Sequence, residues 1–365
     1  MPSLKVYLQY PWKFPDSPYY KYLVSSPPEG IEFLNTKKQR GVITNKRFFW
    51  FSNFLKRNIR RWANKLNLVI PNTHSSPKGN YDLIHCAHCL SKNKIKPWVA
   101  DIESWWSMGI SGTNTKKCIK KIKGTLMHKN CKKIMPWTEH TKKQISMKFP
   151  EIKDKIEIVY PAIPGIKNLK KSKNRNLRII FIARYFYLKG GLIALEVLEK
   201  LRQKYRIEGI LVSNVPENLK KKYSKLKIYN LIPQKKLFEL MESSDIFLYP
   251  SFADTFGFSL LEAMSFGLPI ISINTNKTKT RKEIVEDGKT GLIFDVNKNL
   301  NYYKIEKREK EVINKLILNA SKLIKNKKFK EEMSKNCVNI IKNGKFSIKE
   351  RNKKLREIYS EAIKK

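Results

Sequence analysis

The stretch SFADTFGFSLLEAMSFGLPIIS, residues 251–272, carries two carboxylates, Asp254 and Glu262, and no basic residue. The chain around it is strongly basic, with 75 Lys and Arg against 31 Asp and Glu. Thr255–Gly257 is typical of a turn, the next residues have the pattern of an amphipathic helix, and Gly267–Pro269 ends that helix before another apolar run. One acid therefore lies before the start of a helix that follows a predicted strand, and the other lies just after that start.

Short apolar runs alternate with helical patterns along the whole chain. Leu177–Ala183 predicts a buried strand, and the helix expected over 190–205 has its apolar residues on one face. Further strands are expected at YDLIH, PWVAD, KKIMPW and KIEIVYPAIP in the first half, and at GILVSN, KIYNLI, DIFLYP, PIISIN and GLIFD in the second. This alternation is typical of an α/β fold with parallel sheets.

A chain of 365 residues is too long for one ordinary core. Because its two βα-rich halves have similar size, we predict two Rossmann-like domains facing a cleft. The N-terminal domain is expected at 1–166 and the C-terminal one at 167–347, with a last helix at 348–364 that can pack back on the first domain.

The positive charge is spread along the chain. Residues 1–165 hold 30 Lys and Arg against 10 Asp and Glu, a balance of +20, which leaves +24 of the total +44 for the remainder. A nucleic-acid-binding protein usually gathers such charge on one face, so the spread favours compositional bias over a nucleic-acid partner. Attraction to an anionic membrane surface follows in either case.

The expected compartment is the cytoplasm, with peripheral binding to the inner face of the membrane as an option. No apolar segment follows Met1, and no run reaches the roughly 18 apolar residues of a membrane span. The five cysteines form an odd set without a regular spacing, which does not favour disulfides.

Two cations follow the first strand of the second half. The strand IIFIA ends before Arg184, and Lys189-Gly190 opens the next helix. In open α/β sheets, the carboxyl end of a strand beside a helix N-terminus is the usual ligand crevice. An Arg fork and a Lys charge at this place suit a diphosphate, although two solvated cations are the alternative in so basic a chain.

The two acids strengthen the diphosphate interpretation. Asp254 follows the strand DIFLYPS, and residues 257–260 form a first helical turn whose N–H groups can bind a phosphate oxygen. A favourable interaction with the helix dipole accounts for Asp254 but not for Glu262. Carboxylates that accept hydrogen bonds from sugar hydroxyls account for both, so the combined pattern predicts a nucleotide-sugar site.

The spacing of these cations and acids, with the segment EIVEDGKTGLIF at 283–294, resembles the signature of the retaining GT-B glycosyltransferases of family 4, also called group 1. The resemblance is strong over 177–296 and weaker, but continuous in order, over the first half. It implies a metal-independent hexosyltransferase-type enzyme with a nucleotide-diphospho-sugar donor, no cofactor, and a glycan or lipid-linked acceptor.

The resemblance also implies roles for single residues. Arg184 and Lys189 would neutralise the donor diphosphate and the leaving group, and Glu262 would bind the ribose hydroxyls. Asp254, where many members have Glu, would contact the transferred sugar, and His85 would lie near the donor sugar and the acceptor. The other donor-binding positions are Gly190, Phe256, Gly257, Phe258, Ser259 and Leu260.

The segment HCAHC at 85–89 also permits a zinc interpretation, with His128 and Cys131 as further ligands. Structural zinc usually shows two spaced pairs, and only Cys86-x2-Cys89 has that form here. We therefore expect no metal site.

An amphipathic segment at 45–66 has two interpretations. Its apolar stripe is Phe48, Phe51, Leu55, Ile59, Trp62 and Leu66, with Trp50 and Phe54 as further apolar wedges and most basic residues elsewhere. The segment is either a helix packed on its sheet or an interfacial helix on anionic lipid.

The resemblance thus implies a retaining glycosyltransferase that acts in cell-surface polysaccharide or lipid-linked glycan synthesis. The alternative is a non-catalytic basic α/β protein that binds membrane or nucleic acid. That alternative explains the charge, but not the joint presence of Arg184, Lys189, Asp254 and Glu262.

Overall fold

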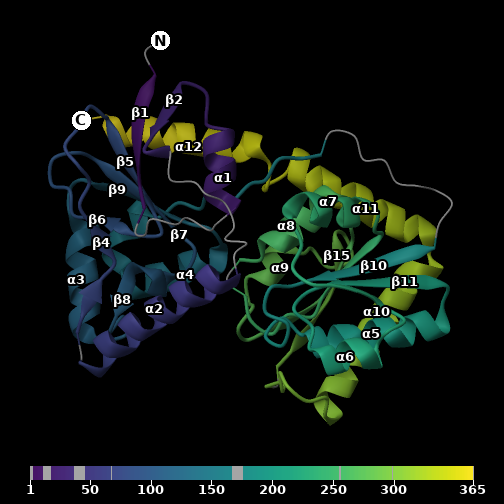
Figure 1. The fold of residues 1–365 in the computed structure, drawn as a ribbon. Coiled ribbons are helices and arrows are strands. Elements are labelled where there is room, and N and C mark those ends of the chain that lie inside the picture. The colour runs from purple at the N-terminus through teal and green to yellow at the C-terminus, as the bar shows by residue number, and fades with distance from the viewer. Residues whose placement is uncertain are drawn as a thin grey trace. The chain divides into compact units, whose positions relative to one another are not determined.

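The computed structural model describes residues 3–10, 18–36, 46–66, 68–166, 176–254, 256–297 and 299–364. The chain divides into two compact units, one formed by residues 1–162 with 348–365 and the other by residues 163–347 (Figure 1).

The first unit is built on a parallel sheet with the strand order β2-β1-β5-β7-β9. These strands are β1 (Leu4–Gln9), β2 (Ile31–Leu34), β5 (Leu83–Ala87), β7 (Trp98–Ile102) and β9 (Cys131–Pro136). All residues of β5 and β7 are buried, as expected of central strands in a parallel sheet that is covered on both faces. Two separate two-stranded sheets belong to the same unit: β3 (Ile70–Pro71) with β8 (Gly109–Ser111), and β4 (Thr73–His74) with β6 (Leu90–Ser91).

The helices of the first unit come from both ends of the chain. They are α1 (Pro18–Ser25), α2 (Lys46–Lys65), α3 (Lys116–Met127), α4 (Glu139–Lys148) and α12 (Ile348–Ile363), with 3₁₀ turns at Trp105–Met108 and Pro150–Lys155. Helix α12, yellow in Figure 1, packs against β5, β7 and β9. The last helix of the chain therefore belongs to the core of the first unit.

The second unit contains a parallel sheet with the order β12-β11-β10-β13-β14-β15. Its strands are β10 (Leu177–Ile182), β11 (Ile207–Val212), β12 (Lys227–Tyr229), β13 (Ile246–Tyr249), β14 (Ile270–Thr275) and β15 (Gly291–Val296). Its helices are α5 (Gly191–Lys204), α6 (Glu217–Lys222), α7 (Gln234–Glu242), α8 (Phe258–Ser265), α9 (Arg281–Ile284), α10 (Lys307–Lys325) and α11 (Lys327–Lys342).

The strand orders confirm the predicted parallel α/β architecture. Numbered along the chain, the second sheet runs 3-2-1-4-5-6, the order of a dinucleotide-binding Rossmann fold, and the first runs 2-1-3-4-5, the flavodoxin-like order. One predicted strand is wrong. In KIEIVYPAIP (155–164), only Ile156 forms a bridge, with Ile134, and the residues after it lie outside any strand.

The start of α5 depends on one glycine. Gly190 has a φ of +75°, and a Cβ placed on it would lie 2.1 Å from the carbonyl oxygen of Pro250. The missing side chain therefore lets the N-terminus of α5 approach the segment that follows β13.

Gly190→Ala should destabilise the second unit far more than Gly288→Ala. Gly288 has the same φ of +75°, but a Cβ there meets no atom within 4 Å. The left-handed conformation alone costs about 1–2 kcal/mol for a residue with a side chain, so Gly288→Ala should lose about that much. Gly190→Ala adds the clash with Pro250 and should lose clearly more. Urea unfolding of both variants measures the difference, and equal losses would show that the close approach is unimportant.

Candidate active site

The predicted lysine and aspartate lie together at the carboxyl end of the second sheet. Lys189 follows β10 and Asp254 follows β13, the two neighbouring strands at which the strand order reverses. The Nζ atom of Lys189 lies 3.1 Å from Oδ1 of Asp254, and it donates a hydrogen bond of 2.8 Å to the carbonyl of Ala253. Both charged side chains keep some exposure, 16% and 15%, so the pair remains accessible from solvent.

Tyr249, the last residue of β13, joins this pair to a second cation. Its hydroxyl donates to Oδ2 of Asp254. Its ring centroid lies 5.9 Å from Lys189 Nζ and 5.2 Å from the guanidinium carbon of Arg281. Burial raises the pKa of Tyr249, and the charge of Asp254 raises it further, so the phenol stays a neutral donor.

The sequence analysis did not single out Tyr249 or Arg281. Tyr249 has the appearance of an ordinary strand residue, and Arg281 lies in the basic run NTNKTKTRK, whose other cations resemble surface charges. Only the pairing of β13 with β14, which carries the chain to Arg281, brings the two side chains together.

The predicted helix start on the other side of Asp254 is present. Gly257 has a φ of +94° and precedes α8, whose first turn contains Phe258, Ser259 and Leu260. Phe256 and Leu260 are buried, and the ring of Phe256 packs on that of Phe258 at 5.1 Å. These apolar side chains hold the turn in place, so main-chain groups are the ones that it can offer to a ligand.

The two remaining charged residues predicted in this unit have intermediate burial. Arg184 lies in the loop after β10, and Glu262 lies on the second turn of α8. Gly190 is buried beside Pro250 at the start of α5. The structure therefore places the predicted donor-binding residues on the loops and helix starts that follow β10 and β13.

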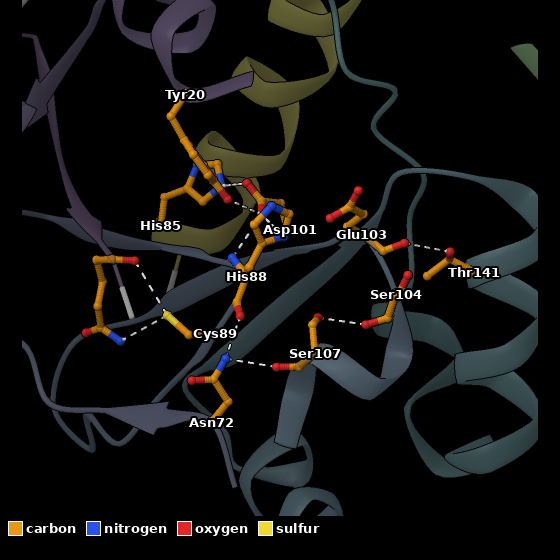
Figure 2. A network of polar contacts seen from close by, with 11 residues as sticks. Tyr20, Asn72, His85, His88, Cys89, Asp101, Glu103, Ser104, Ser107 and Thr141 are labelled. Atoms are coloured by element: carbon orange, nitrogen blue, oxygen red, sulfur yellow. Dashed lines mark hydrogen bonds and ion pairs between the residues drawn. The ribbon is translucent and has the colours of Figure 1, made fainter. Parts of the chain in front are cut away.

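His85 occupies a different setting, in the core of the first unit (Figure 2). It is fully buried on β5, and its Nδ1 lies 2.6 Å from the hydroxyl of Tyr359 on α12. Its Nε2 lies 3.0 Å from Oδ2 of Asp101 on β7, and Tyr20 of α1 donates to the other oxygen of Asp101 at 2.7 Å. Both ring nitrogens are therefore engaged, and His85 joins β5 to β7 within the sheet and to helix α12.

His88, just past the end of β5, is the more exposed histidine of this network, at 21%. Its φ of +53° is unusual for a residue with a side chain. The main chain is held on both sides, because its N–H donates to Asp101 at 3.1 Å and its carbonyl accepts from Asn72 at 2.7 Å. Its ring packs 4.6 Å from that of Trp137, with Nδ1 3.5 Å from Oδ1 of Asp101.

Asp101 is the charged centre of this network. Burial opposes its ionisation, but the hydrogen bond from His85 and the neighbouring His88 outweigh burial, so the pKa of Asp101 lies below its ordinary value. The carboxylate therefore stays ionised and holds both imidazoles. The sequence analysis considered His88 only as a metal ligand, and its left-handed backbone has no signal in the sequence.

The zinc interpretation gains no support from the thiols of HCAHC. Cys86 and Cys89 are buried, and Nε2 of Gln9 lies 3.6 Å and 3.9 Å from their sulfur atoms. Burial raises the pKa of Cys86, which favours the neutral thiol over a metal-binding thiolate. Within the described ranges, no group of three or more His, Cys, Asp or Glu residues could hold a metal ion.

Helix α2 exposes the apolar stripe that the sequence predicted. The exposed side chains are Phe51 (57%), Phe54 (44%), Leu55 (49%), Ile59 (46%), Trp62 (61%) and, just after the helix, Leu66 (62%). The packed-helix interpretation is therefore wrong for these side chains; the side chains of Phe48 and Trp50 lie outside the described residues. Among the helices that the structure describes, none is long and apolar enough to cross a membrane.

Comparison with known proteins identifies the domain that contains Lys189 and Asp254. The model of the family Glycosyl transferases group 1 matches residues 165–336, within the second unit. An uncharacterized 41.2 kDa protein in the cps region of Klebsiella pneumoniae is 28% identical over 162 residues, which are 40% of this chain and 44% of that protein.

A second curated relative has a named activity. The UDP-Gal:alpha-D-GlcNAc-diphosphoundecaprenol alpha-1,3-galactosyltransferase of Escherichia coli is 30% identical over 146 residues, 40% of this chain and 32% of that protein. The chain thus matches less than half the length of each of these relatives.

The fold similarity extends over both units. The crystal structure of a glycosyltransferase from Rickettsia africae matches with a TM-score of 0.62 over 99% of both chains, at 14% sequence identity. This similarity shows the GT-B fold, and the family match confirms the resemblance seen in the motifs. Residues 165–336 therefore match the group 1 glycosyltransferases as a domain.

Proposed function

We propose that this protein is a retaining glycosyltransferase that moves a sugar from a nucleotide-diphospho-sugar to an acceptor hydroxyl. The observation that carries the proposal is the pairing of Lys189 with Asp254 at the switch point between β10 and β13, within the group 1 domain. A cation and an acid at this place can hold a diphosphate and a sugar hydroxyl side by side.

The donor binds in our proposal without a metal ion. Lys189 and Arg184 neutralise the diphosphate, and the main-chain N–H groups at the start of α8 bind a phosphate oxygen. Glu262 accepts hydrogen bonds from the ribose, and Asp254 accepts from the transferred sugar. Lys189 exchanges its contact with Asp254 for the diphosphate, so donor binding releases the carboxylate for the sugar.

Transfer then proceeds on one face of the sugar. The bond between the anomeric carbon and the phosphate oxygen breaks, and the acceptor oxygen bonds to the same face. The acceptor proton passes to the leaving phosphate oxygen, and the two cations stabilise the negative charge that develops there.

The relatives support a glycan acceptor. The name of the Escherichia coli relative specifies a sugar linked to diphosphoundecaprenol, and the Klebsiella relative lies in a cps region. We therefore propose a role in polysaccharide or lipid-linked glycan synthesis, at the cytoplasmic face of a membrane.

Helix α2 supports a peripheral membrane location. Its exposed apolar side chains are accompanied by the exposed basic residues Arg57, Arg61 and Lys65. Aromatic and aliphatic side chains beside basic ones suit the interface of an anionic bilayer, which would place the enzyme beside a lipid-linked acceptor.

Lys189→Ala should abolish stabilisation by the donor. Thermal unfolding of the wild type in EDTA, with a panel of UDP-, GDP- and ADP-sugars, should show a higher Tm with one nucleotide class, because a ligand stabilises the state that it binds. Lys335→Ala removes an exposed lysine of α11 and serves as the control, which should keep the shift. Absence of a shift with every donor in the wild type contradicts the proposed function.

His85 and His88 should respond differently to substitution. His85→Ala leaves Asp101 and Tyr359 without their buried partner and should lower the free energy of unfolding by about 1–3 kcal/mol. We propose that His88, the exposed imidazole of this network, donates a hydrogen bond to the acceptor; His88→Asn, which tolerates the left-handed backbone, should then lower turnover about tenfold and lose less stability than His85→Ala. Urea unfolding and nucleoside diphosphate release measure the two effects, and unchanged turnover in His88→Asn would remove that histidine from the site.

Substitution of the exposed face of α2 should weaken membrane binding. Flotation with phosphatidylcholine vesicles, with and without phosphatidylglycerol, should recover the wild type on the anionic vesicles. The double variant Ile59→Gln, Trp62→Gln should bind at least tenfold more weakly, since each buried apolar side chain contributes about 1.5–3 kcal/mol. Ile95→Gln, which changes a side chain 83% exposed in the same unit, should bind like the wild type. Equal binding by all three proteins argues against this use of the helix.

A further inference from the structure

Arg281 is a cation enclosed in the second unit, with only 2% of its surface exposed. It begins α9, and its Nη1 donates to the carbonyl of Ser251 at 2.9 Å and to the carbonyl of Ile273. Its Nη2 is buried and has no hydrogen-bond partner in the described part of the chain. The guanidinium therefore joins the segment after β13 to β14 through backbone carbonyls.

Burial of a charged guanidinium is costly, so its position in the core requires an explanation from the groups around it. Removing a charge from water without a full set of partners lowers stability, and an apolar side chain of similar volume would fill the same space without that penalty. Burial lowers the pKa of Arg281, whereas Tyr249 and Asp254 favour its charged form. The groups that favour the charge are therefore those of the candidate active site.

The geometry connects Arg281 to Asp254 by two routes. Through its side chain, it lies 5.2 Å from the ring centroid of Tyr249, whose hydroxyl donates to Asp254. Through the main chain, it holds the carbonyl of Ser251, three residues before Asp254. Ser272 completes the arrangement, because its hydroxyl donates to the carbonyl of Tyr249 at 2.6 Å.

We propose that Arg281 is a positioning residue for glycosyl transfer: it fixes Tyr249 and residues 250–254 so that Asp254 is presented to the transferred sugar. This inference rests on the proposed function. Arg281 touches no substrate in this arrangement, and its effect on transfer passes through Tyr249 and Asp254.

A double-mutant cycle separates positioning from a general effect on folding. The probe is the sugar nucleotide that stabilises the wild type most among UDP-glucose, UDP-galactose, UDP-N-acetylglucosamine, GDP-mannose and ADP-glucose, and the readout is nucleoside diphosphate released into water. Arg281→Met and Asp254→Asn should each lower kcat at least tenfold, with KM changed less than threefold. The double variant should be no slower than Asp254→Asn alone, because Arg281 acts through that carboxylate.

Two further variants keep the test informative if Arg281→Met does not fold. Tyr249→Phe removes only the hydroxyl on Asp254 and should lower kcat in the same way. Arg281→Lys keeps the charge and should restore part of the activity. Arg178→Met is the matched control, because this half-buried arginine pairs with Glu208 at the other end of β10; it should lower Tm and leave kcat within twofold of the wild type.

The outcomes distinguish this inference from the proposed function. If the losses of Arg281→Met and Asp254→Asn multiply in the double variant, or if Arg281→Met keeps the wild-type kcat, the positioning role is wrong while the transferase remains. If the wild type releases no nucleoside diphosphate from any of the five donors, the proposed function fails and this inference fails with it.

Discussion

The reversal of strand order between β10 and β13 is the constraint on which the second unit depends. The connections from these neighbouring strands leave in opposite directions, so no crossover covers the carboxyl ends between them. Lys189 and Asp254 arrive there from different segments and form a contact of 3.1 Å. The approach is possible only because Gly190, lacking a Cβ, lets α5 begin against Pro250. Main-chain conformation thus decides where the charged pair lies.

This arrangement also sets the electrostatics of the site. Lys189 and Arg281 lie on the ring of Tyr249, and one carboxylate, that of Asp254, contacts the tyrosine hydroxyl and the lysine. In the proposed donor complex, the diphosphate therefore competes with the carboxylate of Asp254 for Lys189. The internal contact lowers the affinity gained from Lys189, but it also holds both side chains in place before a ligand binds.

Features that depend on residues close together in the sequence could be predicted, whereas features that depend on contacts between distant segments could not. The strands and helices that form the parallel sheets depend on local apolar patterns, and these were predicted well enough to give the fold. KIEIVYPAIP has the apolar pattern of a strand, and its Glu157 and Val159 donate main-chain hydrogen bonds to β9, but Pro161 and Pro164 cannot donate to a ladder and only Ile156 forms a bridge. An apolar pattern does not reveal how far a segment pairs with the strand beside it.

The residues of the candidate site also divide into those that could be predicted from their spacing along the chain and those that could not. The cations and acids that lie close together along the chain, such as Asp254 and Glu262, carried a recognisable spacing. Tyr249 and Arg281 did not, because 32 positions separate them and only the β13–β14 pairing joins them. The histidines differ for another reason: His85 and His88 lie three residues apart, but the strand ends between them, and only His88 leaves the core.

Both units contain a hydrogen bond from a tyrosine to an aspartate, but the two aspartates differ in their exposure to solvent. In each, an aspartate near the carboxyl end of a parallel strand accepts a hydrogen bond from a buried tyrosine: Asp101 from Tyr20, and Asp254 from Tyr249. Asp101 is 1% exposed and is saturated by its own unit, so it fixes the two histidines. Asp254 is 15% exposed and shares its second oxygen with a lysine that a ligand can compete for. The carboxylate–tyrosine contact therefore stabilises the core of the first unit. In the second unit, it holds the carboxylate of Asp254 where solvent can reach it.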